Sequence, residues 1–392
     1  MKTTFFNVQH GDAIFINYGD RGLVRDFGSL SRNAQQYIQK LASFLVRAKK
    51  KYAGYPFEAM LTHPHCDHYS GFEYMLTNLN GTNKFFDIAY IPWLDFSTLK
   101  SLHALYLQLG LLHLYIFPQR YAANKNIKDW MKIAPLMADL SKHLYGVGEN
   151  TKLPHKNYTE QILWPPQPSY VRPADYGISV DDYIDFVVNE LLDDAQKNIY
   201  EDSFNQIFSI LSSIKTDGSG ENLPNRFHLI KEMLDRIKPF DLKIAKHPFL
   251  RRLSYSVQLK MQRDIDDHSI VFKVDEEALF FSDLHSSSIG KIAMKHLVNQ
   301  KFKLMKSAHH GSRFGAKMPK SNCTASKIVH SCGPSPYNYN GPDVRYCQLL
   351  TQQNPPNYAN DIICTDWNYA SLKWKYPNHG YNIVSPKKRI TL

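Results

Sequence analysis

Cysteine is scarce in this chain: five of its 392 residues are cysteines, and no two of them form a Cys-x-x-Cys pair. An odd number of scattered cysteines argues against a disulfide framework and against a cysteine-ligated zinc site. The sparse thiols instead favour a reducing compartment, and we expect the cytoplasm.

Long apolar runs are also missing. The longest apolar stretch, near 109–117, is interrupted by His113 and is too short to span a bilayer. The first residues turn polar directly after a short apolar patch, which argues against a secretory signal. We therefore predict a soluble protein with no membrane partner.

Acidic residues are outnumbered, 36 against 47 Lys and Arg, and the net charge is +11. Such a balance favours polyanionic partners, nucleic acid above all, although many cytoplasmic proteins are mildly basic. The charge is unevenly spread. The segment 181–205 has eight Asp or Glu against one Lys, whereas 226–263 has ten Lys or Arg against three acidic residues.

Hydrophobic patterning divides the chain into three parts. Residues 1–95 alternate short strands with amphipathic helices, as in a layered α/β unit. Residues 96–265 are predicted to be helical insertions, interrupted by a strand at 157–166 that ends in two prolines. Residues 266–392 return to strands and one helix, so we predict that they complete the α/β unit begun by 1–95.

A cluster of metal-binding side chains follows an apolar strand predicted at 57–62. Three imidazoles and one carboxylate occupy the six positions 63–68. Alternation brings His63 and His65 to one side, where they can share an ion, and Asp67 and His68 can reach a second one. These donors suit zinc and manganese. A chance surface cluster is the competing interpretation, and the strand-end spacing argues against it.

Further candidates stand at later strand boundaries. Asp283 ends an apolar strand and is placed to bridge two ions, although a helix cap would look the same. His309 and His310 also end a strand, and the pattern does not decide which of them binds metal. His268 begins a strand and is the best remaining ligand for the first ion, although an isolated histidine there is more often a surface residue.

These motifs together resemble the metallo-β-lactamase superfamily, whose HxHxDH motif is matched by 63–68. The branch that they resemble is the metal-dependent hydrolase domain of the DNA-uptake competence proteins (ComEC-like). The matching segments, all in order, are Asn7-Val8-Gln9-His10-Gly11-Asp12-Ala13, Asp26-Phe27-Gly28, Pro165-Pro166, Asp266-Asp267-His268-Ser269, Ser282-Asp283 and Lys306-Ser307-Ala308-His309-His310-Gly311-Ser312. The resemblance covers 1–95, 157–166 and 266–392.

The chain departs from the branch pattern at three positions. His10 replaces a small or polar turn residue, and Ser282 replaces glycine. His268 stands where many relatives have asparagine, which leaves the third ligand of the first ion open. The helical insertions lie outside the resemblance.

The resemblance implies an α/β fold, the metallo-β-lactamase αββα sandwich with large helical insertions, and two divalent ions, zinc or manganese. The implied ligands are His63, His65 and His268 for the first ion and Asp67, His68 and His310 for the second, with Asp283 bridging them. Asp67, Asp283 and His309 are the implied catalytic residues, and His309 would contact the phosphate or protonate the leaving oxygen. Asp12 and Asp26 would hydrogen-bond ligand histidines, and Lys306, Ser312 and Arg313 would contact substrate anions.

Fold alone does not fix the substrate, because the superfamily cleaves phosphodiesters, thioesters and lactams. We expect a DNA nuclease, since the resembled branch contains nucleases and the chain is basic. A role as an effector in antiphage defence would be consistent with such a nuclease. Arg251 and Arg252 lie among aromatics and fit a single-strand track, or else a solvated helix face. The alternatives are a small-molecule phosphodiesterase for a cyclic nucleotide or phosphocholine-like ester, and a metal-binding effector controlled by a regulatory protein partner.

Overall fold

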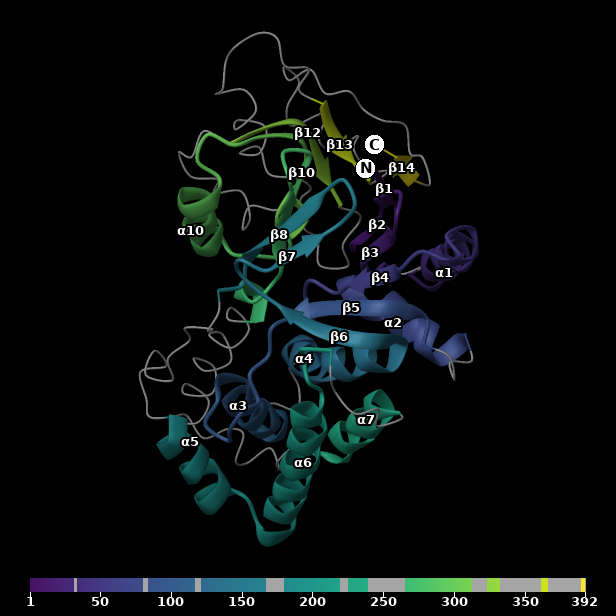
Figure 1. The fold of residues 1–392 in the computed structure, drawn as a ribbon. Helices are drawn as coiled ribbons and strands as arrows, with labels where there is room; N and C mark the ends of the chain where they lie inside the picture. The colour runs from purple at the N-terminus through teal and green to yellow at the C-terminus, as the bar shows by residue number, and fades with distance from the viewer. Residues whose placement is uncertain are drawn as a thin grey trace.

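The fold is built on two seven-stranded mixed sheets, seen in a computed structural model (Figure 1). The structure describes residues 1–31, 34–79, 84–116, 121–166, 180–218, 225–238, 265–311, 323–331, 361–365 and 389–391. The first sheet has the order β14 (Arg389–Thr391), β1 (Lys2–Phe6), β2 (Ala13–Asn17), β3 (Gly22–Phe27), β4 (Phe57–Met60), β5 (Phe86–Pro92) and β6 (Ser141–Val147). The second has the order β13 (Asp361–Cys364), β12 (Thr324–His330), β11 (Lys301–Lys306), β10 (Ala278–Phe280), β9 (Val271–Val274), β8 (Thr159–Trp164) and β7 (Lys152–Pro154).

The two sheets pack face to face. Their shared core contains Ile16 and Leu23 from the first sheet and Phe272 and Phe280 from the second. Because each inner strand is covered on both faces, β3 is buried along its whole length. Its charged Arg25 extends between the sheets, donates to the carbonyl oxygen of Phe281 at 2.8 Å, and lies over the rings of Phe272 and Phe280.

Helices cover both outer faces. α1 (Ala34–Lys51), α2 (Cys66–Asn78) and α4 (Tyr121–Leu140) pack on the first sheet, and α10 (Ser286–His296) packs on the second. The layer order is therefore helix, sheet, sheet, helix, and the predicted αββα sandwich is confirmed. No helix in the described part of the chain has both the length and the apolar character needed to cross a membrane.

The central helices extend the core of the first sheet. α4 contacts α2, β5 and β6, and the same apolar cluster continues into the other central helices. Figure 1 shows them stacked beyond β6, on the side away from α10. They are α3 (Leu102–Ile116), α5 (Val180–Phe186) with a π-helical turn at Val187–Leu191, α6 (Asp194–Ser213) and α7 (Arg226–Arg236).

The region 96–265 differs from the prediction of helices with a single strand. β6 and β7 also lie in it, and each adds an edge strand to one sheet. The sequence of β6 does not predict a strand, because it lacks the alternation of apolar and polar residues that is typical of one. Only Ser141, Leu144 and Val147 are buried. Pairing with β5 in parallel, directly after α4 ends, makes this segment a strand.

Strand direction positions the site. β3, β4, β5 and β6 are parallel to one another, as are β10, β11, β12 and β13. The carboxyl ends of neighbouring parallel strands meet at one edge, where loops bring polar side chains together. Candidate ligands or their supporting residues lie at the end of β3 and after β4, β10 and β11.

Candidate metal centre

The motif after β4 divides between a loop and a helix. His63 and His65 lie in the loop, and α2 begins at Cys66, so that Asp67 and His68 occupy its first turn. A carboxylate is favoured there by the helix dipole. The strand end and the helix start thus aim both pairs of ligands at the same edge of the sheet.

The second sheet contributes Asp283 after β10 and His310 after β11. His309, His310 and Gly311 form a short turn with φ values of 45°, 54° and 82°. Left-handed backbone at two non-glycine residues is uncommon and is retained only where its surroundings require it. The turn directs His310 back toward α2.

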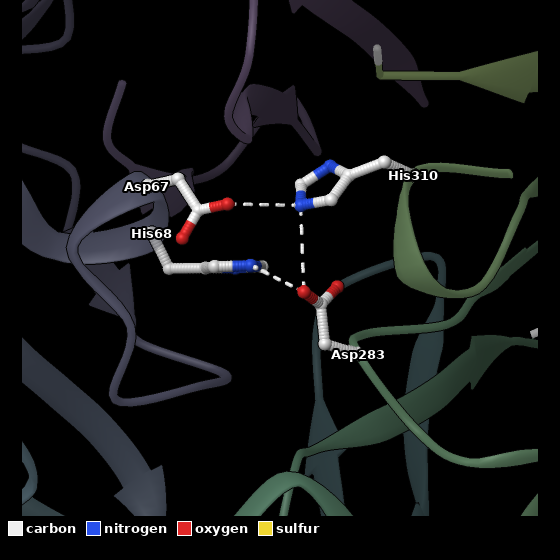
Figure 2. Close-up of side chains that lie close together, drawn as sticks. All are labelled: Asp67, His68, Asp283 and His310. Atoms are coloured by element: carbon white, nitrogen blue, oxygen red, sulfur yellow. Dashed lines mark hydrogen bonds and ion pairs between the residues drawn. The ribbon is translucent and has the colours of Figure 1, made fainter. Parts of the chain in front are cut away.

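Four buried side chains converge on one point: Asp67, His68, Asp283 and His310 each offer one ligand atom, all within 4.8 Å of one another (Figure 2). Nε2 of His310 lies 3.1 Å from Asp67 Oδ2 and 3.4 Å from Asp283 Oδ2. Nε2 of His68 lies 3.3 Å from Asp283 Oδ2. Such a set of two imidazoles and two carboxylates can bind one divalent ion.

A second group consists of His63, His65 and Asp266. Oδ1 of Asp266 lies 3.3 Å from Nε2 of His63 and 3.6 Å from Nε2 of His65. The ring of His63 lies 5.2 Å from that of His68, so the two groups are neighbours. Two ions can therefore lie side by side.

Asp266, and not the expected His268, completes this group. The amide of His268 donates to Ile265 and that of Ser269 to Asp266, which makes a tight turn before β9. A helical turn rotates successive side chains by about 100°, so residues two apart point in different directions. The ring of His268 lies instead 5.7 Å from that of His103 in α3. The sequence signal for Asp266 was its place in the Asp-Asp-His-Ser segment.

The residues present fit a metal. Nε2 of three histidines and one oxygen each of two aspartates are buried without a well-formed hydrogen bond in the described part of the chain: His63, His65, His68, Asp266 and Asp283. Buried polar atoms in a folded protein nearly always have partners, so a group of such atoms facing one point indicates a ligand. Imidazole nitrogens and carboxylate oxygens are the donors that zinc and manganese accept.

The carboxylates dominate the electrostatics. Burial alone would raise the pKa of Asp67, but the hydrogen bond from His310 and the nearby His68 outweigh it and hold that pKa well below its usual value. The pKa of Asp283 is likewise lowered, since His310 and His68 outweigh burial. Conversely, Asp283 and Asp26 overcome burial and raise the pKa of His68 to about 10. The centre is therefore strongly attractive to cations.

Supporting hydrogen bonds fix the imidazole rings. Nδ1 of His63 lies 2.8 Å from Ser269 Oγ, and Nδ1 of His310 lies 2.8 Å from the carbonyl oxygen of Ser331. These contacts occupy one nitrogen of each ring and leave Nε2 for the ligand group, as is usual around bound metals.

Asp26 contacts a ligand histidine, as expected. Asp26 Oδ2 lies 3.2 Å from Nδ1 of His68. The same carboxylate accepts from the amide and the hydroxyl of Thr62 at 2.7 Å and 2.6 Å. The loop after β4 is thus tied to β3 directly beside the ligands.

Lys306 is placed differently from the expectation. We expected it to contact substrate, but its side chain is completely buried and Nζ lies 2.6 Å from Asp12 Oδ2. Burial alone would raise the pKa of Asp12, but Lys306, His310, His68 and Arg25 together outweigh burial and lower that pKa to about 2. Asp12 also lies 3.8 Å from Nδ1 of His68 and 3.9 Å from Nδ1 of His310. Lys306 therefore neutralises a supporting carboxylate and is not open to substrate.

His310, and not His309, belongs to the ligand group. His309 is half-buried next to it, and desolvation lowers the pKa of its imidazole. His10, for which no role was predicted, also lies beside the ligands: its Nε2 is 3.7 Å from Asp67 Oδ2. Burial and the nearby His310 lower its pKa to about 4. Ser312, Arg313, Arg251 and Arg252, the other expected substrate contacts, lie outside the described residues.

No protein-family model and no curated protein sequence matches the chain. Among solved structures, the metallo-β-lactamase fold protein YhfI from Bacillus subtilis aligns with 100% of this chain and 99% of its own, at 7% identity and a TM-score of 0.37. The fold assignment rests on the two packed sheets and their outer helices.

Proposed function

We propose that the protein is a two-metal-dependent hydrolase of phosphodiester bonds, and specifically a DNA nuclease of the cytoplasm. The observation that carries this proposal is a pair of neighbouring ligand groups in which every member except the half-buried His65 is buried: His63, His65 and Asp266 beside Asp67, His68, Asp283 and His310. Two divalent ions so close together are typical of enzymes that cleave phosphoesters.

The ions would supply Lewis acidity to a phosphoryl oxygen and an activated water for its attack. Among the chain's own residues, Asp283 is the best placed to bridge the two groups. Its Oδ2 faces His68 and His310, while its Oδ1 has no well-formed hydrogen bond among the described residues. His309 and His10 flank the ligands without belonging to them, and a neutral imidazole can donate one hydrogen bond to a substrate oxygen.

Charge supports a nucleic-acid substrate. The chain has a net charge of +11, and 226–263 alone has ten Lys or Arg against three acidic residues. Cations of this density neutralise backbone phosphates and release counterions. A cyclic nucleotide or phosphocholine-like ester, with a single phosphate, would gain less from them.

A substrate screen tests the proposal. The purified protein, loaded with manganese or with zinc, is incubated with single-stranded DNA, double-stranded DNA, RNA and bis-p-nitrophenyl phosphate. We expect cleavage of DNA and of the chromogenic ester, lost on chelation and in Asp67→Ala and His68→Ala. Hydrolysis of small esters alone would indicate a small-molecule phosphodiesterase. A metal-loaded protein that cleaves nothing would indicate an effector that needs a regulatory partner.

A charge-reversal variant separates nucleic-acid binding from the chemistry. We expect Arg251→Glu with Arg252→Glu to weaken binding and cleavage of long DNA, and to leave the chromogenic ester near the wild-type rate. An equal loss of both activities would mean that the segment is structural. No loss of either would place the DNA path elsewhere.

A further inference from the structure

We infer that a second ligand site, for a phosphate-bearing ligand of nucleotide size, lies at the edge of the first sheet opposite the metal centre. A hollow of about 690 Å³ opens there between the end of α1 and the beginnings of β4, β5 and β6. The metal ligands follow the other end of β4, so this site is separate from the proposed function. In Figure 1, α1 lies beside β3 and β4.

The hollow is strongly basic. Among the described residues, four lysines and one aspartate line it, a net charge of +3: Lys49, Lys50, Lys84, Lys142 and Asp87. Asp87 is already engaged, because Oδ2 accepts from the amide of Phe57 at 2.9 Å and Oδ1 lies 2.7 Å from Nζ of Lys142. The hollow therefore has four ammonium groups and a single carboxylate, which is already occupied by the Phe57 amide and by Lys142.

Two of these ammonium groups donate to backbone carbonyls, and neither forms an ion pair with a carboxylate in the described part of the chain. Lys49 donates to the carbonyl oxygen of Phe85, and Lys84 donates to those of Ala138 and Asp139 at 2.7 Å and 3.1 Å. The Asp139 carboxylate itself accepts from the amide of Phe227 at 3.0 Å and does not line the hollow. Lys49 and Lys84 are both half-buried, so each cation is partly removed from water, and this burial lowers the pKa of both amines.

Partly desolvated cations in excess of carboxylates are the recognition chemistry of phosphate, which accepts several charged hydrogen bonds at once. An anion bound here would also relieve the repulsion between Lys49 and Lys142, which contributes to the lowered pKa of Lys49. The hollow therefore selects for a ligand with concentrated negative charge.

Aromatic side chains extend the site beyond one phosphate group. Tyr55 stands at the hollow with 52% of its surface exposed, and Phe85 and Tyr52 also line it. An exposed aromatic ring beside a basic surface offers a nucleobase a stacking face. The volume of the hollow matches the sites of small organic ligands, which is more than inorganic phosphate would need. A free nucleotide and the 5′-phosphorylated end of a strand share this chemistry.

Calorimetric titration of the full chain in excess chelator tests the site without any contribution from bound metal. The probes are inorganic phosphate, AMP, ADP, and a hexathymidylate with and without a 5′-phosphate. We expect AMP or ADP to bind more tightly than phosphate, and the phosphorylated strand to bind more tightly than the unphosphorylated one. Tighter binding of the mononucleotides than of the phosphorylated strand would identify a free nucleotide as the ligand. The reverse order would identify the 5′-phosphorylated end of a strand.

Two sets of variants test the residues. Lys50 and Lys142 are exposed, so Lys50→Glu with Lys142→Glu should keep the fold and weaken nucleotide binding at least tenfold. The matched control is Lys291→Glu with Lys301→Glu, two exposed lysines on the other sheet layer, which should leave binding unchanged. Tyr55→Ala should weaken the binding of AMP several-fold and leave the binding of inorganic phosphate unaffected. Equal affinities of the wild type and the Lys50/Lys142 variant for every probe would overturn the proposal.

Discussion

Oδ1 of Asp266 lies 3.3 Å from Nε2 of His63, and the hydroxyl of Ser269, three residues further on, lies 2.8 Å from Nδ1 of the same ring. A single turn before β9 therefore has two roles. Its Ser269 holds the His63 ring in position, and its Asp266 supplies a carboxylate that can bind the same metal ion as His63. The first group of the metal centre combines two imidazoles with an oxygen donor, and the second group contains two carboxylates.

Asp266→Ala is expected to remove one of the two ions, because it deletes the single carboxylate of the first group. Elemental analysis after metal-replete purification should give about one ion per chain, against about two in the wild type. His268→Ala is the matched control and should retain both. The opposite pattern, with metal lost only in His268→Ala, would contradict the geometry.

Asp266 is also expected to influence which metal the first group prefers. Carboxylate oxygen suits manganese, whereas a third imidazole suits zinc. We expect Asp266→His to raise the ratio of zinc to manganese bound from an equimolar mixture of the two. An unchanged ratio would show that Asp266 does not contact the ion.

Gly28→Ala is expected to disrupt the centre without touching a ligand. A Cβ atom on Gly28 would lie 2.3 Å from the backbone carbon of Asp67 and 2.4 Å from the amide of His68, so α2 would have to move. We expect loss of metal together with destabilisation of a few kcal/mol. Gly290→Ala is the control, since nothing lies within 4 Å of its added Cβ. Its helical position should make it neutral or stabilising by about 0.5–1 kcal/mol. Metal content and urea unfolding report both effects.

Lys306→Met should destabilise the metal-free protein by about 3–5 kcal/mol, the usual effect of removing one partner of a buried ion pair. Asp12 would be left charged in a buried position that Lys306 now neutralises at 2.6 Å. Urea unfolding in excess chelator measures the change. Lys306→Met combined with Asp12→Leu should recover part of the loss. A single variant as stable as the wild type would show that the pair is not formed.

Glu58 should make the protein less stable as the pH rises through the weakly acidic range. Burial raises its folded pKa from 4.5 to about 7, even though Arg21 lies 3.1 Å away and opposes the shift. Between these two values the folded protein binds more protons than the unfolded chain, so stability falls from pH 4.5 toward pH 7, by at most about 3 kcal/mol.

Glu58→Gln should flatten that part of the profile, measured by urea unfolding at pH 5, 6 and 7. The exposed Glu276→Gln is the control and should follow the wild type. If Glu58→Gln retains the full slope, another group is responsible for it.

The sequence by itself predicted the layered fold and most members of the two candidate ligand groups. Apolar strands that end in ligand residues are local features, and the run from His63 to His68 is readable because all of its members lie within six residues. Strand patterning also placed Asp283 at the end of β10, and Asp26 at the end of β3. Parallel strands then bring such ends to one edge of each sheet.

The tertiary structure alone decided the partners of these residues. The choice between His309 and His310 depends on three successive left-handed residues after β11, and that between Asp266 and His268 on the direction of one turn before β9. The burial of Lys306 depends on two sheets that meet around Asp12. Strand pairing likewise made β6 a strand. Local sequence specifies which residues lie at the end of a helix or strand. The direction of a side chain there follows from contacts with residues far along the chain, such as the contact between Asp67 and His310, which are 243 positions apart.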